Sequence, residues 1–371
     1  MKNKVNPYEV KGKIDYTKLV KEFGVTPINK ELLKKIEKIT GELHPFLRRG
    51  IFFSHRDMKL LLEDYEKGKK FFLYTGRAPS GPIHLGHISV WLFMRWLQEK
   101  FDAEVWFQFP DEEKYLFKQN SNWEEIQKWT KENMLDIIAL GFDPKKTHFI
   151  INTKHAGIIY PEAIKVAKRI TFSSIKAAFG FTDSNNIGSI FYTAMQTVPV
   201  FLPNVLSGKK EKCLIPLGID QDVHFRISRD VVEKLGHQKP AIIHAKFMPP
   251  LTGVEGKMSS SDVSKAILMT DSPTQVKKKI NKHAFSGGQD TIEEHRKKGG
   301  NVKIDVACQW LKYFEEDDKK LEDIYTKYSQ GELLSGEVKK ILIDKINTFL
   351  AEHQKKRKQA EKILDKFIYK I

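Results

Sequence analysis

Short apolar runs alternate with amphipathic segments between residues 71 and 245. The runs predict buried strands at residues 71–75, 104–109, 147–152, 213–218 and 241–245. Between them, apolar residues recur every three to four positions over residues 85–99, 123–140 and 222–235, which predicts helices. Alternation of this kind indicates a parallel sheet covered on both faces. We therefore expect an α/β fold with a doubly wound, Rossmann-like domain.

Helical patterns flank and interrupt this region. Residues 153–212 contain extra helical segments at 161–170 and 172–179, which we interpret as an insertion between the two halves of the sheet. Residues 1–70 predict a mixed, mostly helical extension, with helices over 16–23 and 29–40. A third helix is expected to begin at Ser54, as its N-cap, and to stop at Gly68.

The chain is predicted to be helical from about residue 272 to its end. Ser272, Pro273 and Gln275 have the spacing of an N-cap, a first-turn proline and a capping-box partner. Apolar residues continue at helical spacing over 338–349 and 363–371. We expect three parts: the extension 1–70, a Rossmann-like domain 71–283 with its insertion at about 153–212, and an all-α domain 284–371.

Charge and cysteine content narrow the possible partners and compartments. The 371 residues include 63 Lys and Arg against 47 acidic residues, and this net charge of +16 favours a polyanionic partner such as nucleic acid or an anionic membrane. A merely basic surface explains the charge equally well. Two cysteines in apolar segments argue against a disulfide framework and a cysteine metal site, and we expect no metal-ligating residues.

The hydrophobic pattern of the sequence predicts no membrane anchor. No apolar run approaches the roughly 18 residues of a membrane-spanning helix, and the first residues lack the apolar centre of a signal peptide. We expect no membrane partner and a reducing compartment, most simply the cytoplasm.

The segment 74–87 (YTGRAPSGPIHLGH) follows a predicted strand and opens a predicted helix. Its glycines allow the backbone to approach a ligand. His84 and His87 lie in the first helical turn, where free N–H groups favour negative charge, and both can donate to the same phosphate or ribose oxygens. A turn with a buried capping histidine is the structural alternative.

The segment 256–262 (GKMSSSD) follows the last predicted strand and offers Lys257 as a mobile cation beside several hydroxyl groups. Alone, it could be a serine-rich linker. Together, in this order and context, the two segments resemble the signatures of class I aminoacyl-tRNA synthetases. That resemblance implies that His84 and His87 bind ATP and stabilise its α-phosphate, and that the Lys257 loop closes over pyrophosphate. It places Arg77, Gly86, Met258 and Ser259 in the same ATP site.

Further segments resemble the tryptophanyl-tRNA synthetases of the eukaryotic and archaeal type over most of the chain. They are FFSHRDM (52–58), LYTGR (73–77), DEEKYLFK (111–118), FGFTDS (179–184), GIDQD (218–222), FRISRDV (225–231) and NKHAFSGGQDTIEEHR (281–296). Tyrosyl-tRNA synthetases, which share the subclass, are the nearest competitor.

The resemblance implies the residues of the amino-acid pocket. Tyr74 and Gln108 would hold the indole N–H, Glu113, Gln196 and Gln221 the ammonium group, Lys114 the carboxylate, and Gly76, Asp220 and Phe225 would complete the walls. An indole is a flat apolar body with one donor, so aromatic walls and one acceptor cluster suit it. From the residues alone, Tyr74 could be a core aromatic and Gln108 an ordinary polar residue at a strand end.

One position departs from the wider class. Many class I enzymes have a lysine where this sequence has Ser260, although the eukaryotic-type tryptophan enzymes also lack it. The cation that offsets the charge of the leaving pyrophosphate is then Lys257, Arg77 or Mg²⁺.

The resemblance implies an ATP- and Mg²⁺-dependent ligase that forms tryptophanyl-adenylate and transfers the amino acid to the 3′-terminal ribose of tRNA(Trp), at the 2′-hydroxyl. Residues 284–371 would read the anticodon, and the protein would act as a homodimer. Two other classes remain open: a nucleotidyltransferase, which also uses a His-x-Gly-His turn, and a non-catalytic RNA-binding protein that retains the fold. The intact His84, His87 and Lys257 argue against the second.

Overall fold

The computed structural model describes residues 4–5, 10–12, 14–258 and 265–371. Its strands are β1 (Lys4–Val5), β2 (Val10–Lys11), β3 (Thr26–Pro27), β4 (Phe52–Arg56), β5 (Phe71–Gly76), β6 (Val105–Phe109), β7 (Thr147–Ile151), β8 (Lys212–Gly218) and β9 (Ala241–Ala245). Its first helices are α1 (Tyr16–Phe23), α2 (Lys30–Thr40), α3 (Pro45–Arg48), α4 (Met58–Glu66), α5 (Leu85–Phe101), α6 (Glu113–Phe117), α7 (Trp123–Ala139), α8 (Ala156–Ala167), α9 (Phe172–Phe179), α10 (Ile187–Met195) and α11 (Leu202–Ser207).

The remaining helices are α12 (Asp222–Val232), α13 (Pro273–His283), α14 (Ile292–Lys298), α15 (Val306–Phe314), α16 (Asp318–Ser329) and α17 (Ser335–Ala360). Short 3₁₀ segments are η1 (Val198–Val200), η2 (Ile219–Gln221), η3 (Glu233–Leu235) and η5 (Glu361–Lys366). No helix in the described part of the chain combines the length and apolar character that a membrane crossing requires.

A seven-stranded sheet in the order β3-β4-β9-β8-β5-β6-β7 forms the centre of the molecule. The strands from β9 to β7 are parallel, whereas β4 and β3 join the β9 edge antiparallel. From β5, the chain first builds outward through β6 and β7 and then returns to the other side through β8 and β9. The carboxyl ends of β5 and its neighbours therefore meet at a topological switch point, where ligands bind in open α/β sheets.

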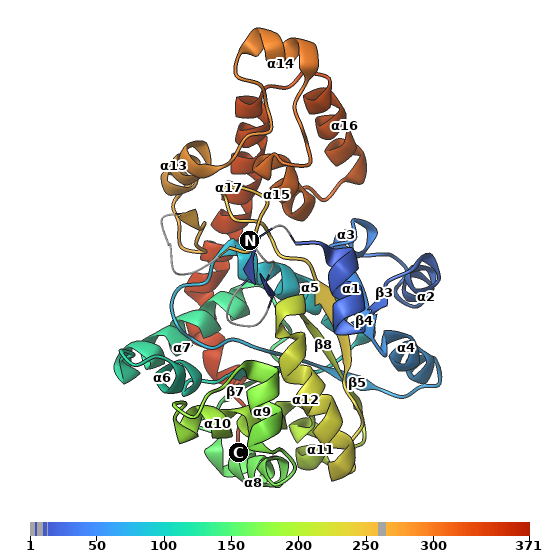
Figure 1. Cartoon of the computed structure of the whole chain (residues 1–371), viewed down its shortest axis with the longest axis vertical. Coiled ribbons are helices and arrows are strands. Elements are labelled where there is room, and N and C mark those ends of the chain that lie inside the picture. Colours follow the sequence, from blue (N-terminus) through green and yellow to red (C-terminus); the bar gives the residue numbers. More distant parts are fainter. Residues whose placement is uncertain (1–3, 6–9, 13, 259–264) are drawn as a thin grey trace.

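The two faces of the sheet belong to two separate cores. Alternating side chains such as Leu73 and Phe107 pack with α5, α7 and the C-terminal helices. Their neighbours Tyr74 and Trp106 pack on the opposite face with α8, α10, α11 and α12. Figure 1 shows the C-terminal helices α14 and α16 at one end of the molecule and α8 at the other. The predicted doubly wound α/β fold with a helical C-terminal region is confirmed.

The five predicted strands and most predicted helices lie within about two residues of their expected bounds. Helices α1 and α9 match the predicted ranges, and Ser272 and Gln275 form the expected capping box. The inserted segment 153–212 is helical, as predicted, although α8 begins at Ala156 rather than at Pro161.

The prediction that Ser54 caps a helix is wrong. Ser54 lies inside β4, fully buried, with its hydroxyl 3.1 Å from Nδ1 of His244 on β9. Arg56, the last residue of the strand, pairs with Asp222 on α12 at 2.8 Å. These polar side chains can occupy a buried strand because partners remote in sequence satisfy them. The helix begins later, at Met58, after Asp57 adopts a left-handed conformation.

The prediction of helix to the end of the chain is also wrong. Helix α17 ends at Ala360, η5 follows, and the chain then runs extended beside β7. The backbone N–H of Phe149 donates to the carbonyl of Phe367 at 2.6 Å, and the N–H of Tyr369 donates to the carbonyl of Phe149 at 3.0 Å. We call residues 367–369 the C-terminal tail. It covers part of the edge of β7, near which Figure 1 places the C-terminus.

Helix α17 connects the C-terminal helices to the sheet domain. Near its end, Arg357 Nε lies 2.6 Å and His353 Nε2 3.1 Å from Oδ1 of Asp136 on α7. Asp136 and His353 are buried. The domain boundaries at about 70 and 283 stay predictions, but this contact ties the helical region firmly to the remainder of the fold.

Candidate active site

The predicted amino-acid pocket forms where β5 and β6 end. The parallel register pairs Gly76 with Gln108, which brings the hydroxyl of Tyr74 to 2.6 Å from Oε1 of Gln108, to which it donates. Phe225 on α12 meets the Tyr74 ring edge to face, with 5.9 Å between ring centroids. A Cβ on Gly76 would lie 3.2 Å from the Gln108 carbonyl oxygen, so glycine avoids a tight contact between the two strands here.

Two of the acceptors proposed for an ammonium group lie at the start of α6 and at the end of α10. Glu113 at the start of α6 accepts a hydrogen bond from the Tyr192 hydroxyl at 3.2 Å and pairs with Lys114 at 2.7 Å. Burial alone would raise the pKa of Glu113, but Lys114 and these hydrogen bonds lower it below its usual range, so the carboxylate is ionised at neutral pH. Gln196 Oε1 is buried without a hydrogen-bond partner among the described residues, which leaves it available to a donor.

Asp220 connects the end of β8 to the second sequence motif. It lies in η2, directly after β8, and its Oδ2 is 2.6 Å from the Lys257 ammonium and 3.1 Å from Nε2 of Gln221. Lys257 also lies 6.0 Å above the Phe247 ring. The predicted residues Asp220, Gln221 and Lys257 are therefore brought together.

The two histidines stack at the N-terminus of α5. Their rings lie 3.7 Å apart, centroid to centroid. His84 is the N-cap, and its Nδ1 accepts from the Gly86 N–H at 3.2 Å, while Nδ1 of His87 accepts from the His84 N–H at 3.3 Å. A capping box normally uses hydroxyl or carboxyl groups, and here imidazoles fill both roles.

This geometry fixes the protonation of both rings. Burial, with a further contribution from Arg77, lowers the pKa of His84 to about 3. Burial and the neighbouring His84 likewise lower the pKa of His87 well below its usual range. Because Nδ1 of each neutral ring accepts a hydrogen bond, Nε2 of each carries the proton. In the part of the chain that the structure describes, the buried Nε2 of His84 has no acceptor, so it is a donor ready for a ligand.

The two sequence motifs meet at Gly86. A Cβ there would lie 3.0 Å from the His84 ring and 3.1 Å from Cβ of Met258, so the absence of a side chain lets the Lys257 loop pack on the histidine turn. Beyond that loop, the Leu85 N–H donates to the Ile267 carbonyl at 2.9 Å. Both ends of the loop are thus anchored beside His84. The predicted ligand Ser259, and Ser260, lie outside the described residues.

Arg77 directly follows β5, and Asn133 links it to the segment that leads to the histidine turn. Its Nε donates to Oδ1 of Asn133 at 3.3 Å, and Asn133 donates in turn to the Gly81 carbonyl at 3.0 Å. Burial lowers the pKa of Arg77 to about 10, which leaves it cationic at neutral pH. Its Nη2 is buried and has no partner within the described ranges, so a cationic donor is available beside the histidines.

Comparison with known proteins decides the family. A model of the family described as "tRNA synthetases class I (W and Y)" matches residues 66–351. The tryptophan–tRNA ligase of Saccharolobus solfataricus is 50% identical over 366 residues, 98% of this chain and 95% of that protein. That of Pyrococcus furiosus is 51% identical over 368 residues, 99% of this chain and 94% of the relative.

The solved tryptophanyl-tRNA synthetase of Plasmodium falciparum superposes with a TM-score of 0.90 at 46% identity, covering 96% of this chain and 98% of that one. The chain belongs to the class I tryptophan–tRNA ligases of the archaeal and eukaryotic type. Its activity is that of a tryptophan–tRNA ligase, an aminoacyl-tRNA synthetase, and it is ATP-dependent like its class.

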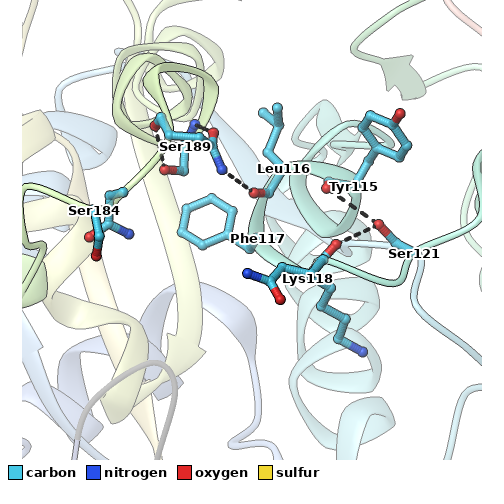
Figure 2. Close-up of a pocket in the computed structure, with 10 residues that line it drawn as sticks. Tyr115, Leu116, Phe117, Lys118, Ser121, Ser184 and Ser189 are labelled. Atoms are coloured by element: carbon cyan, nitrogen blue, oxygen red, sulfur yellow. Dashed lines mark hydrogen bonds between the residues drawn. The ribbon is translucent and has the colours of Figure 1, made fainter.

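A separate cavity of about 420 Å³ opens beside α6 of the ligase. Its lining residues, most of them labelled in Figure 2, are Tyr115, Leu116, Phe117, Lys118, Gln119, Ser121, Ser184, Asn185, Asn186 and Ser189. Several of its polar groups are already paired: Ser121 donates to the Lys118 carbonyl at 2.9 Å, and Asn186 donates to the Leu116 carbonyl at 2.8 Å. None of these ten residues belongs to the predicted amino-acid pocket around Tyr74 and Gln108.

Two residues that contact the candidate site were not expected from the sequence. Tyr192 fixes the Glu113 carboxylate from the inserted segment, and Asn133 fixes Arg77 from the middle of α7. Neither follows a strand or lies in a recognisable motif, so no local signal marks them. Within the described ranges, no cluster of three or more His, Cys, Asp or Glu side chains could hold a metal ion.

Proposed function

We propose that the ligase works in two steps. The tryptophan carboxylate attacks the α-phosphorus of ATP, a bond forms to the carboxylate oxygen, the bond to the β-phosphate oxygen breaks, and pyrophosphate leaves with the electron pair. The tRNA 3′-terminal ribose hydroxyl then attacks the acyl carbon, the bond from that carbon to the phosphate oxygen breaks, and AMP leaves with the electron pair while its phosphate takes up the hydroxyl proton. The first step needs little acid–base chemistry, so positioning and charge stabilisation would carry the rate.

The charges of the pocket match an amino-acid zwitterion. Glu113 and Lys114 form an ion pair 2.7 Å long beside the Tyr74–Gln108 pair. A substrate ammonium would take the Glu113 carboxylate with Gln196 and Gln221, and the substrate carboxylate would take Lys114. Asp220, Gly76 and Phe225 would close the walls. A buried charge needs such an opposite partner, because leaving one unpaired costs several kcal/mol (roughly).

The paired Nε2 donors at the start of α5 are the observation that carries the ATP step. Neutral histidines at a helix N-terminus present N–H donors to phosphate oxygens, beside the free backbone N–H groups that favour negative charge. Gly86 would let the phosphates approach the histidine turn, and Lys257, Met258 and Ser259 would enclose them from the other side. Since Lys257 is paired with Asp220 and Arg77 keeps a buried unpaired donor among the described residues, Arg77 is our candidate for the cation at the pyrophosphate.

Mg²⁺ fits this arrangement only when it binds together with ATP, through the phosphates. The described residues offer no carboxylate cluster of their own, and Mg²⁺ commonly uses substrate phosphates and water as ligands. When bound, it would neutralise phosphate charge while the protein's donors orient the α-phosphate.

Tryptophan-dependent exchange of pyrophosphate into ATP tests the first step. We expect exchange with tryptophan and background rates with the other nineteen amino acids. A nucleotidyltransferase would exchange without any amino acid, and a non-catalytic protein would not exchange at all. Either result would contradict the proposal.

We further propose that the C-terminal helices bind tRNA and read its anticodon. Residues 335–371 carry ten Lys or Arg against five Asp or Glu, and Phe285 and Ile292 expose apolar surface in the same region. Unpaired RNA bases stack on such exposed side chains, while cations hold the phosphates.

The salt dependence of binding should reveal this contact. The affinity for tRNA is expected to fall steeply with salt, with a log–log slope of about −0.7 for each single-strand phosphate contacted. Tryptophan affinity should change far less. Replacing the exposed Lys297 of α14 by alanine should make the slope less steep by about one contact, whereas Lys59→Ala on α4 should leave it unchanged. Equal slopes for all three proteins would contradict this placement of the tRNA.

A homodimer and a cytoplasmic location remain parts of the proposal. The dimer has support from exposed apolar side chains on the inserted helices, at Tyr160, Ile164, Phe172 and Ile187. Tyr160 and Ile164 are four residues apart and share one face of α8. A second copy of the chain would cover this face.

A further inference from the structure

A chain of three hydrogen bonds leads away from the indole pocket. Tyr74 donates to Oε1 of Gln108 at 2.6 Å, Nε2 of Gln108 donates to Oδ1 of Asn152 at 2.9 Å, and Nδ2 of Asn152 donates to Oε1 of Glu112 at 2.6 Å. We call these four residues the polar relay. Its last two members carry no role in the reaction described so far.

Strand pairing places the relay. Gln108 pairs with Ile150 in the parallel register of β6 and β7, so the residue just beyond β7, Asn152, lies beside the end of β6. Its backbone N–H donates to the Phe109 carbonyl at 3.1 Å. Gln108 and Asn152 are each 1% exposed, so water does not compete for their amide groups.

The relay has a direction that only its last member can set. A side-chain amide has one end that donates and one that accepts, and it can turn over when its neighbours permit either orientation. A carboxylate accepts only. Because Glu112 accepts from Asn152, the Asn152 oxygen faces Gln108, and the Gln108 nitrogen must face Asn152. The Gln108 oxygen is thereby left facing Tyr74 and the pocket.

We infer that Asn152 and Glu112 are positioning residues that set the ligase's preference for a ring N–H, by holding the Gln108 oxygen toward the substrate. The inference rests on the proposed role of Gln108. If Gln108 turned over, its NH₂ group would face the indole N–H, and two donors would meet. The selectivity of the pocket would then depend on a residue that never touches tryptophan.

The surroundings of Glu112 suit this task. Its second oxygen, Oε2, is buried and has no hydrogen-bond partner in the described part of the chain. Burial raises the pKa of Glu112 to about 7, although the Asn152 hydrogen bond opposes the rise. A proton taken up near neutrality can reside on Oε2, and Oε1 still accepts from Asn152. With the proton on Oε2, the relay has the same direction as with the ionised carboxylate.

The test compares tryptophan with an analogue in which sulfur replaces the ring N–H, β-(3-benzothienyl)alanine. In the exchange assay, Asn152→Ala should raise KM for tryptophan about 10- to 100-fold, the effect of one hydrogen bond lost from a buried group. The inhibition constant of the analogue should change less than about threefold. KM for ATP and kcat should change little, because the lost interaction serves binding of the amino acid.

Further variants separate the direction of the relay from the charge of Glu112 and from effects on folding. Glu112→Gln keeps an acceptor oxygen for Asn152 and should stay within about threefold of the parent, whereas Glu112→Ala should behave like Asn152→Ala. Thr153→Val is the matched control. Thr153 follows Asn152 directly but is not part of the relay, and the substitution removes the hydrogen bond from its hydroxyl to Asp111. The ratio of KM for tryptophan to the inhibition constant of the analogue should stay unchanged.

Three results would overturn the inference. Asn152→Ala could affect tryptophan and the analogue equally, it could affect neither, or Glu112→Gln could be as damaging as Glu112→Ala. If Gln108→Ala abolishes the preference for tryptophan while Asn152→Ala keeps it, the relay is wrong and the pocket stands. If Gln108→Ala also keeps the preference, the pocket itself is misplaced.

Discussion

Tyrosine is expected to drive pyrophosphate exchange about 10⁴-fold less efficiently than tryptophan, without any editing reaction. A site built to hydrogen-bond a buried substrate N–H discriminates at this level, because an analogue without that group leaves the site's acceptors unpaired. Here the acceptors are Oε1 of Gln108 and the Tyr74 oxygen, 2.6 Å apart and both buried. The tyrosine hydroxyl would lie elsewhere and would leave part of an indole-sized space empty.

Gln108→Ala tests which group makes this distinction. It should lower kcat/KM for tryptophan and narrow the gap to analogues without a ring N–H, while KM for ATP stays unchanged. Gln98→Ala is a matched control, since it removes a buried amide that bonds Thr147 at the amino end of β7, away from the carboxyl ends of the strands. If tyrosine instead supports exchange as well as tryptophan does, the indole pocket is wrong, although the ATP site is not affected.

His87→Ala is expected to lower the exchange rate by ~10²-fold, the usual cost of removing one donor to a charge that develops in the transition state. The expectation follows from the neutral His87 ring, whose Nε2 carries the proton and whose neighbour is another such donor. The loss should appear mainly in kcat, because the donor acts on the reacting phosphate.

Since Nδ1 of His87 also caps the helix, the variant's melting temperature must be measured beside its rate. His237→Ala provides a control, because that imidazole stacks on Phe201, 4.4 Å between centroids, outside the site. A folded His87→Ala protein with the parent's exchange rate would refute the assignment.

The sequence predicted the parallel part of the sheet well because its strands are buried on both faces. A strand such as residues 213–218 is almost continuously apolar, and that pattern needs no knowledge of remote residues. The opposite holds for β4. Its run FFSHR contains three polar residues, and two of them, Ser54 and Arg56, have their partners in His244 and Asp222, 190 and 166 residues later in the chain.

The candidate site likewise contains residues that the local sequence predicted and residues that it did not. The glycines and histidines of residues 74–87 lie in one contiguous segment, so their chemistry could be expected from residue types and spacing. Tyr192 and Asn152 act through partners 79 and 44 residues away. Asn152 does have one signal in the sequence, since it is the polar residue that ends the predicted strand 147–152. Its orientation, however, depends on Glu112 and follows only from the folded structure.

The C-terminal tail has a consequence for how the protein is made. Synthesis proceeds from the N-terminus, and strands β5 to β9 leave the ribosome well before residues 367–369. Until the tail arrives, the edge of β7 presents unpaired backbone groups, and such edges pair readily with other chains. A nascent chain that has already formed its sheet must therefore stay soluble through the synthesis of helices α13 to α17 before residues 367–369 can cover this edge.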